Sequence, residues 1–520
     1  MKPEIWRRLR QAVQILAILL FLYFFIQTNS LSVQKTWSVL FYRLDPLVAL
    51  TAILAGRVFI PGLALAVLTL AVTLIFGRVW CGWFCPMGTM LEWLAPRRFR
   101  KRLPVRRQPP PESWRLIKYF LLVIMVFAAL LGNQSLLFFD PITIMTRTMS
   151  SAVWPGLRYA LTQSEAFLYN FTFLWGVLDT LHNAVISPLF QEVEAVFILA
   201  MPIFLFFVAI VAFNWWAERF WCRYLCPLGG LLGLVSRLAF IRREVGEECN
   251  DCGLCSPTCP TGTIDPQNGY RSDPAECTVC YDCIIACKRQ GVNFQWQIPA
   301  WKPAEGQEYD LSRRQALEAL GVAVVGVALA GVETITVRQP ATLIRPPGAW
   351  LTDFEALCIR CGECVRVCPT QGLQASLFEG GWANIFTPLL VPRLGYCSYT
   401  CNACSQVCPS VAIPPMALEK KQATPIGLAR VDRDRCLPWT YQIACIICEE
   451  VCPVADKAVK LEEIKIVSTL GEAVVLQRPS VVMDLCIGCG ICEYKCPMGG
   501  EAAIRVFAPT DVSSQGGLLQ

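Results

Sequence analysis

Residues 249–287 read CNDCGLCSPTCPTGTIDPQNGYRSDPAECTVCYDCIIAC and contain two cysteine runs with the spacing C-x2-C-x2-C-x3-C. Bacterial 4Fe-4S sites have this spacing: three closely spaced thiolates bind one cluster and the fourth binds the neighbouring cluster. The spacing therefore predicts a ferredoxin-like domain with two clusters. The two predicted ligand sets are Cys249, Cys252, Cys255 and Cys287, and Cys277, Cys280, Cys283 and Cys259.

Four more runs of the same kind follow between residues 358 and 496. The outer two have the standard spacing, and the inner two are stretched at the first gap. Zinc sites need two separated C-x2-C pairs, so the tight triple spacing favours iron-sulfur clusters, and six repeats of one register do not suit disulfides. The sequence thus predicts six 4Fe-4S clusters in all. The four later runs are Cys358, Cys361, Cys364 and Cys368; Cys397, Cys401, Cys404 and Cys408; Cys436, Cys445, Cys448 and Cys452; and Cys486, Cys489, Cys492 and Cys496.

The six runs use 24 of the 28 cysteines, and the other four lie in two copies of one motif. Residues 80–88 read WCGWFCPMG and residues 221–229 read WCRYLCPLG. Each copy follows the order helix, Asp-Pro, helix, with the dipeptides at Asp45 and Asp140. This order predicts a duplicated two-helix unit.

The chemistry of the paired motifs has three readings. Related by the repeat, Cys81, Cys85, Cys222 and Cys226 could meet near a pseudo-twofold axis and hold a further metal centre. They could instead form a redox-active dithiol, or shape a structural turn. The sequence leaves these readings open.

The composition is that of a membrane protein: 54% of the residues are hydrophobic and 17% are charged, against about 25% charged in soluble domains. Apolar windows at about 11–28, 58–77, 116–132 and 195–213 predict four transmembrane helices. The basic flanks predict a cytoplasmic N-terminus and a cytoplasmic 78–115 loop, with outward loops near 29–57 and 133–195. We read the basic run 97–107 as a topology signal and expect no nucleic-acid partner.

The chain has a single histidine, His182, which excludes several cofactors. Haem ligation by two histidines and Cys2His2 zinc sites each need two histidines, and c-type haem attachment needs a histidine within a C-x-x-C-H motif. The chain also has no G-x-G-x-x-G or Walker motif and no covalent-flavin motif. We therefore expect no haem, no flavin and no NAD. The position of His182 in a predicted outward loop favours an ordinary surface residue.

These patterns predict an α-helical membrane domain and two α+β ferredoxin-like iron-sulfur domains. Ser312-Arg313-Arg314 precedes a short apolar run, as in a twin-arginine export signal. This would carry the second ferredoxin domain to the periplasm, although a packed linker helix with the C-terminus inside is the alternative. The expected domains are a membrane domain at 1–245, a cytoplasmic two-cluster domain at 246–300, a linker with a possible fifth transmembrane helix at 301–340, and a four-cluster domain, periplasmic if exported, at 341–510.

On these motifs, residues 1–300 resemble the NapH-type membrane ferredoxins, a group that includes the membrane core of NosR. Residues 310–500 resemble the NapG/MauM-type ferredoxins. The resemblance implies electron transfer from the quinol pool of the bacterial inner membrane to a periplasmic oxidoreductase or small carrier, of the periplasmic nitrate reductase type. The methylamine-utilisation relatives imply an alternative, electron supply for maturing a periplasmic metallo- or quinoprotein. Fusion of both parts in one chain departs from the usual two-gene arrangement.

The order of the four later runs resembles the four-cluster ferredoxin subunits of molybdoenzyme-type complexes. That resemblance implies that the first run shares its last ligand with the fourth, and the second with the third. The implied fourth ligands are Cys496 for the first cluster, Cys452 for the second, Cys408 for the third and Cys368 for the fourth.

In this interpretation the chain is at most a quinol dehydrogenase component, and otherwise an electron carrier. Asp45 and Asp140, expected near the outer face, are candidate acceptors for the quinol protons. Asp followed by Pro is also the N-cap and N1 pattern of a helix, and that reading is the stronger of the two.

Overall fold

The computed structural model describes residues 3–28, 39–95, 110–190, 197–297, 343–467 and 473–508, and the single residue 321. The basic run 97–107 and the twin-arginine segment 312–332 lie outside the described residues, apart from residue 321. Contacts divide the chain into two compact units. Unit 1 comprises Met1–Gln27, Trp37–Thr148 and Pro202–Val332, and unit 2 comprises Thr28–Thr36, Met149–Met201 and Glu333–Gln520.

Unit 1 is built on the apolar helices that the sequence predicts. Within the described ranges, the helices Glu4–Gln27 and Glu112–Leu130 are long and apolar enough to cross a bilayer. At 1.5 Å per residue, the 11 residues of α4 and the 14 of α12 fall short of a core about 30 Å thick. Four transmembrane helices therefore stay a prediction. The helices of unit 1's helical part are α1 (Pro3–Gln27), α2 (Leu40–Arg43), α3 (Pro46–Gly56), α4 (Ala66–Phe76), α5 (Pro86–Trp93), α7 (Leu116–Leu130), α8 (Pro141–Thr148), α12 (Ala200–Phe213) and α13 (Pro227–Ser236).

The repeat is more elaborate than two helices and a motif. Each Asp-Pro begins a separate short helix, α3 or α8, before the helix that leads into the cysteine motif. Both motifs then form a π-helical turn, η2 (Trp80–Phe84) and η8 (Trp221–Leu225). A proline at the first position starts the following helix, α5 or α13, because its fixed φ suits a position where no N–H is needed.

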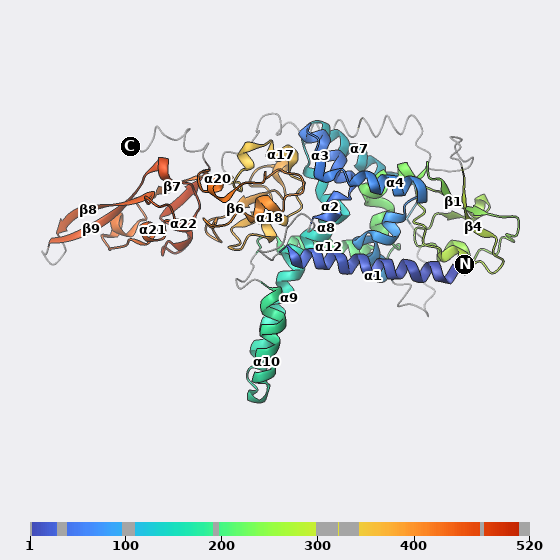
Figure 1. Ribbon diagram of the computed structural model, residues 1–520, viewed down its shortest axis with the longest axis horizontal. Coiled ribbons are helices and arrows are strands. Elements are labelled where there is room, and N and C mark those ends of the chain that lie inside the picture. The colour runs from blue at the N-terminus through green and yellow to red at the C-terminus, as the bar shows by residue number, and fades with distance from the viewer. Residues whose placement is uncertain are drawn as a thin grey trace. The chain divides into compact units, whose positions relative to one another are not determined.

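A small ferredoxin module completes unit 1 (Figure 1). Its cysteines lie on short loops and on two helices that pack against each other. The strand β1 pairs antiparallel with β4, and β2 with β3. The elements are β1 (Ile241–Val245), α14 (Cys255–Thr258), β2 (Ile264–Asp265), β3 (Arg271–Ser272), α15 (Asp282–Ala286) and β4 (Val292–Trp296).

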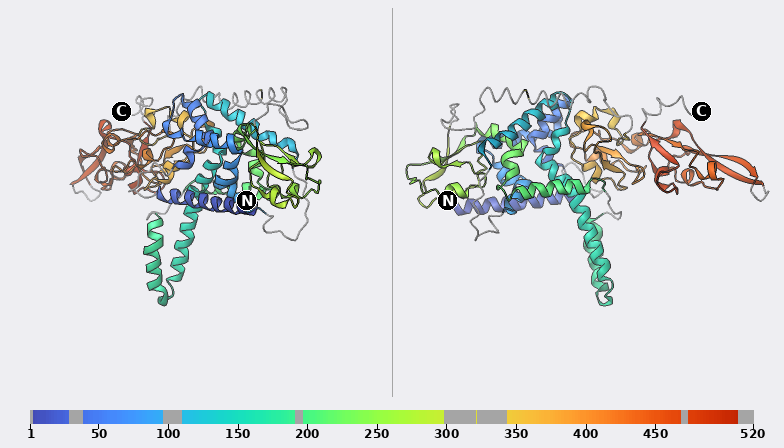
Figure 2. Two further views of the ribbon diagram at one scale, coloured as in Figure 1. Left: turned by 45° about the vertical axis from the view of Figure 1, so that its right-hand side comes forward. Right: turned by 180° about the vertical axis from the view of Figure 1, so that it is seen from behind.

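Unit 2 holds the other four cysteine runs on short helices and hairpins. Its antiparallel pairs are β5–β6, β7–β10 and β8–β9, and the strands of the last pair, the long ribbon in Figure 1, have nine residues each. The helices α9 (Trp154–Leu168) and α10 (Trp175–Leu181) run side by side in Figure 2. The remaining elements are α11 (Ser187–Leu189), α17 (Phe354–Leu357), α18 (Glu363–Arg366), β5 (Leu373–Ala375), β6 (Pro388–Leu390), α19 (Ala403–Gln406), α20 (Leu418–Gln422), β7 (Leu428–Val431), α21 (Ile447–Glu450), β8 (Val459–Val467), β9 (Ala473–Val481), α22 (Ile491–Lys495) and β10 (Ile504–Phe507).

Candidate metal centres

The module of unit 1 places Cys259 beside the cysteines of the other run. The charge of Cys259 acts on Cys277, Cys280 and Cys283, although Cys259 belongs to the other run. The charges of Cys249 and Cys252 act on Cys255. Cys287 packs into a small core that contains both Cys255 and Cys283. The placement of Cys259 agrees with the predicted exchange, while the site of Cys287 and cluster binding itself stay predictions.

The four runs of unit 2 also group their cysteines in fours. Three cavities are each lined by four cysteines, and a fourth set is defined by the mutual charge effects of its thiols. The cavity sets are Cys368, Cys397, Cys401 and Cys404; Cys436, Cys445, Cys448 and Cys496; and Cys452, Cys486, Cys489 and Cys492. The fourth set is Cys358, Cys361, Cys364 and Cys408.

This grouping corrects the expected ligand exchange in unit 2. The first run exchanges its last cysteine with the second run, not the fourth, and the third run exchanges with the fourth. The physical reason is local packing: α18 lies against α19, and α21 lies against α22. Each such helix carries the third cysteine of its run, so the cysteine that ends one run reaches the site of its helix partner. Unit 2 therefore repeats the two-cluster module of unit 1 twice.

The residues at these sites fit iron-sulfur clusters. Within the described parts of the chain, no three Cys, His, Asp or Glu side chains converge closely enough to hold a single metal ion. The four thiolates of a cluster bind different iron atoms, so they surround a volume rather than meet at a point. Backbone amides already donate to several sulfurs, as Ala503 does to Cys496 Sγ (3.3 Å) and Ile413 to Cys408 Sγ (3.4 Å). Such N–H···S bonds stabilise thiolates and tune cluster potentials.

The two repeat motifs of unit 1 bring their four cysteines together in the interior. Cys81, Cys85, Cys222 and Cys226 are all buried. The charge of Cys81 acts on Cys222 and Cys226, that of Cys85 on Cys226, and that of Cys222 on Cys85, so the two motifs lie close to each other. Cys85 and Cys226 are the N-caps of α5 and α13: Gly88 N donates to Cys85 Sγ (3.4 Å) and Gly229 N to Cys226 Sγ (3.2 Å). Burial raises the pKa of the Cys85 and Cys226 thiols.

Two buried arginines accompany these motifs, and the sequence analysis missed them. Arg78 and Arg219 each stand three residues before the first cysteine of their motif, so the repeated pattern is R-x-W-C-x-x-x-C-P. Arg219 Nη1 donates to the carbonyl of Cys81 (3.2 Å), and its Nη2 lies 2.6 Å from Glu92 Oε2. The repeated arginine was the available signal.

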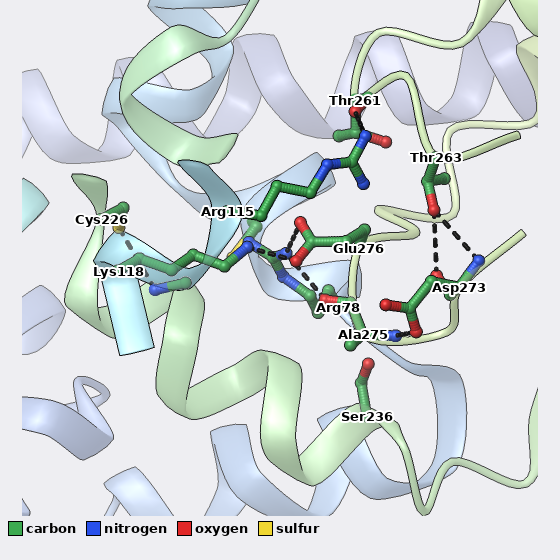
Figure 3. Close-up of polar contacts among 12 residues, drawn as sticks. Arg78, Arg115, Lys118, Cys226, Ser236, Thr261, Thr263, Asp273, Ala275 and Glu276 are labelled. Carbon is green, nitrogen blue, oxygen red and sulfur yellow. Dashed lines mark hydrogen bonds and ion pairs between the residues drawn. The ribbon is translucent and has the colours of Figure 1, made fainter. Parts of the chain in front are cut away.

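Glu276, immediately before Cys277, joins the ferredoxin module to the helical part (Figure 3). It is fully buried and forms ion pairs with Lys118 of α7 and with Arg78, whose Nη1 lies 3.2 Å from Glu276 Oε2. Arg115 extends beside them and donates to the carbonyl of Gly262 (2.6 Å). Burial alone would raise the pKa of Glu276, but Lys118 and Arg78 hold it below its ordinary value. Unpaired, any of these buried charges would be strongly destabilising.

The structure confirms that Asp45 and Asp140 are helix N-caps. Asp45 Oδ1 accepts hydrogen bonds from the amides of Leu47 (2.8 Å) and Val48 (3.3 Å), and Asp140 Oδ2 accepts one from Thr143 (2.8 Å). The two carboxyl groups, one from each repeat, also face each other, and both side chains are fully buried.

The surroundings of this carboxyl pair differ from the expected outer-face position. The charge of Asp140 acts on Cys85, so the pair lies near the cysteine motifs rather than a bilayer away from them. The reason is the short length of α3 and α8, which start at these aspartates and do not span a membrane. Burial and the neighbouring Asp140 raise the pKa of Asp45 well above its ordinary value.

His182 agrees with an ordinary surface role: it is half exposed, and its Nδ1 lies 2.9 Å from Glu165 Oε1.

Comparison with known proteins supports the iron-sulfur assignment. The profile of a family described as "4Fe-4S binding domain" matches residues 58–105 and 199–246, which contain the two repeat motifs. Profiles described as "4Fe-4S dicluster domain" match residues 357–413 and 443–500. The two dicluster matches coincide with the two modules of unit 2. No solved structure is significantly similar to this chain.

Each of the following relatives covers only a part of the chain. The ferredoxin-type protein NapH of Haemophilus influenzae is 24% identical over 265 residues, covering 48% of this chain and 74% of NapH. The ferredoxin-type protein NapG of Escherichia coli is 37% identical over 139 residues, covering 26% of this chain and 58% of NapG. The putative electron transport protein YccM of Escherichia coli is 28% identical over 279 residues, covering 52% of this chain and 65% of YccM.

These similarities confirm the resemblance to polyferredoxins of the NapH/NapG type. With the matched 4Fe-4S domains, they identify an iron-sulfur electron-transfer protein of the Nap and Mau ferredoxin type. The apolar helices and the NapH relative weakly favour a membrane location.

Proposed function

We propose that the chain is a multi-pass inner-membrane electron conduit that oxidises quinol and passes the electrons to a periplasmic oxidoreductase of the nitrate reductase type. Six 4Fe-4S clusters would be held by the six cysteine sets described above. When bound, such clusters supply one-electron carriage, whereas quinol gives up two electrons and two protons. The protein must therefore hold those protons while the electrons leave singly.

The buried pair of Asp45 and Asp140 is the observation that carries this proposal. Burial and mutual repulsion make it unfavourable to ionise both carboxyl groups at the same time. The pair therefore favours a state in which one carboxyl group is protonated and the other is ionised. In that state the ionised carboxylate can accept a proton and the protonated carboxyl group can release one, with little rearrangement of the protein. The cysteine motifs lie near this pair, so a centre that accepts an electron from quinol would lie close to the carboxyl group that accepts the proton.

Replacement of both aspartates by asparagine tests the quinol step. Asparagine is an equally good N-cap, so α3 and α8 keep their starts while the proton acceptors are lost. In full-length protein reconstituted into lipid, we expect the rate of cluster bleaching by added quinol to fall by roughly 100-fold. Reduction by dithionite, which needs no proton acceptor in the protein, should be unchanged.

Asp265 offers a matched control, because it is also an Asp-Pro N-cap and accepts a hydrogen bond from Gln267 N (2.8 Å). The variant D265N should leave the quinol rate at the wild-type value. An unchanged rate in D45N/D140N would exclude the carboxyl pair as the proton acceptor. Failure of quinol to reduce the clusters of the wild-type protein would exclude quinol oxidation itself.

Export of the four-cluster domain is part of the same proposal. The twin-arginine segment is the sequence feature that supports it. Protease added to right-side-out vesicles should cut residues 341–510, whereas protection there and cleavage in inverted vesicles would place the domain in the cytoplasm.

A second candidate function follows from a further relative. The methylamine utilization ferredoxin-type protein MauM of Methylobacillus flagellatus is 35% identical over 139 residues. The chain could by analogy supply electrons for maturing a periplasmic metallo- or quinoprotein. Deletion of the gene separates the two: a fully assembled partner enzyme that lacks quinol-linked activity supports the conduit, and an immature partner supports the maturation role.

A further inference from the structure

We propose that Cys81, Cys85, Cys222 and Cys226 form one shared site for an additional iron-sulfur cluster, separate from the six sites of the cysteine runs. Each motif supplies two cysteines, and four thiolates are the ligand set of a [2Fe-2S] or [4Fe-4S] cluster. The matched family profile covers each motif by itself. A single site assembled from both motifs goes beyond that match and explains why neither motif has four cysteines of its own.

The local backbone prepares two of the four thiols for metal binding. Cys85 and Cys226 stand at the positive N-terminal ends of α5, with 8 residues, and α13, with 10. Each sulfur already accepts one amide hydrogen bond from the first turn of its helix. A helix N-terminus stabilises a thiolate, and the thiolate is the form that binds metal.

The two buried arginines supply the charge compensation that a buried tetrathiolate site needs. The charge of Arg78 acts on Cys81 and Cys226, and that of Arg219 acts on Cys222. Each arginine reaches across the repeat. Arg219 donates to the carbonyl of Cys81, while a Cβ atom added at Gly229 would lie 2.8 Å from Arg78 Nη2. Pairing with Glu92 and Glu276 holds the two guanidinium groups in place.

The first motif also touches the loop that carries Cys277 and Cys280. Trp83 Nε1 donates to the carbonyl of Val279 (3.0 Å), and a Cβ at Gly82 would lie 2.2 Å from the carbonyl oxygen of Thr278. Thr278 and Val279 stand between the two cysteines, so the first motif contacts the backbone that joins two predicted ligands of one cluster.

The second motif touches the loop that supplies the fourth ligand of the same cluster. A Cβ at Gly262 would lie 2.4 Å from Nη2 of Arg223, which is inside the second motif. Gly262 N donates a hydrogen bond to the carbonyl of Cys259 (3.1 Å), the predicted fourth ligand. Both halves of the proposed site therefore adjoin one ferredoxin site. Transfer between them would move one electron and break no bond; its direction rests on the proposed function.

Paired cysteine variants test whether the site is shared. The full-length protein is purified without oxygen as wild type, C81S/C85S, C222S/C226S and the quadruple variant, and bound iron and sulfide are measured. A shared site predicts that each pair variant loses about two to four iron atoms per chain and that the quadruple variant loses no more. Unchanged iron in the quadruple variant would overturn the proposal in favour of a dithiol or a structural turn, and additive losses would indicate two independent sites.

A measurement on the wild-type protein covers the case in which these variants do not fold. Native mass spectrometry of the fully loaded chain should show a species with seven clusters, and a maximum of six would overturn the proposal. Neither readout depends on quinol, so failure of quinol oxidation leaves the additional site standing, and loss of the site leaves quinol oxidation to be judged by its own assay.

Arginine variants test the charge compensation. R78Q and R219Q should retain the iron but shift the midpoint potential of this one centre to a more negative value, because reduction adds negative charge that the cation no longer balances. R78K and R219K should restore most of the potential. An unchanged potential in both glutamine variants would show that the arginines only support the fold.

Discussion

The chain gathers cysteines in fours in two different ways. In the ferredoxin modules, one run supplies three cysteines and the neighbouring run supplies the fourth, as Cys496 does for the site of Cys436, Cys445 and Cys448. In the helical repeat, two motifs far apart in the sequence supply two cysteines each. The first arrangement is set by loop spacing and the packing of two short helices. The second depends on the symmetry of a larger helical scaffold.

The difference teaches where the specificity of each site lies. A module needs little beyond its own cysteines, because the spacing itself wraps the loop around a cluster. The repeat motifs hold only two cysteines each and rely on residues outside the motif, namely the helix N-termini and the arginines Arg78 and Arg219. Mutations outside the cysteines should therefore affect the helical site and its junction far more than the modules of unit 2.

The largest expected effect concerns ligand exchange in unit 2. If neighbouring runs exchange ligands, Cys368 belongs to the site of Cys404, and the variant C368S/C404S should lose no more iron than either single variant, about four atoms per chain. The variant C368S/C492S should lose about eight, because it damages two sites. Iron analysis of the full-length protein measures both losses.

The opposite pattern would restore exchange between the first and the fourth run. In that case Cys368 would share its site with Cys492, and the loss would be about four atoms in C368S/C492S and about eight in C368S/C404S. The difference between the modules and the helical repeat would then disappear, because ligand pairing in the modules would also depend on long-range packing.

The second prediction concerns the junction between the helical part and its module. E276Q removes the carboxylate and leaves Lys118 and Arg78 buried without their partner. Loss of one member of a buried ion pair costs about 3–5 kcal/mol, so thermal unfolding of unit 1 should begin at a markedly lower temperature. E247Q, at an exposed position in the same module, should change little. Equal melting curves for the two variants would show that the junction does not depend on this charge cluster.

The sequence predicts much of this arrangement because metal-ligand spacing is a local property. The runs, the repeat motifs and the Asp-Pro N-caps could all be read from short windows, and the matched dicluster domains agree with the runs of unit 2. The short helices α3 and α8 lie in segments that the sequence predicts as outward loops, because helices of 11 and 8 residues are too short for a hydropathy window sized for a bilayer span.

The exchange of ligands in unit 2 and the facing of Asp45 and Asp140 depend instead on tertiary packing. The order of the runs is compatible with either exchange, and only the packing of α18 on α19 and of α21 on α22 decides between them. Glu276 carried no signal in isolation, since a glutamate before a cysteine run is ordinary; its role follows from Lys118 and Arg78, which are distant in sequence. The repeated arginine, three residues before the first cysteine of each motif, is by contrast a local feature of the sequence.

The smallest predicted effect tests the contact between the first repeat motif and the ligand loop. In G82A the added methyl group would lie 2.2 Å from the carbonyl oxygen of Thr278, so the two loops must separate. Such overpacking typically costs about 1–3 kcal/mol, which should lower the melting temperature of unit 1 by a few degrees. The matched control in the same unit is G62A, in the turn Pro61–Leu63, where the atom nearest to an added Cβ is Arg43 Nε at 3.9 Å. This variant should melt close to the wild-type temperature. If G82A melts like the wild type, the motif does not rest on the loop of Cys277 and Cys280, and the helical site must be regarded as separate from the module beside it.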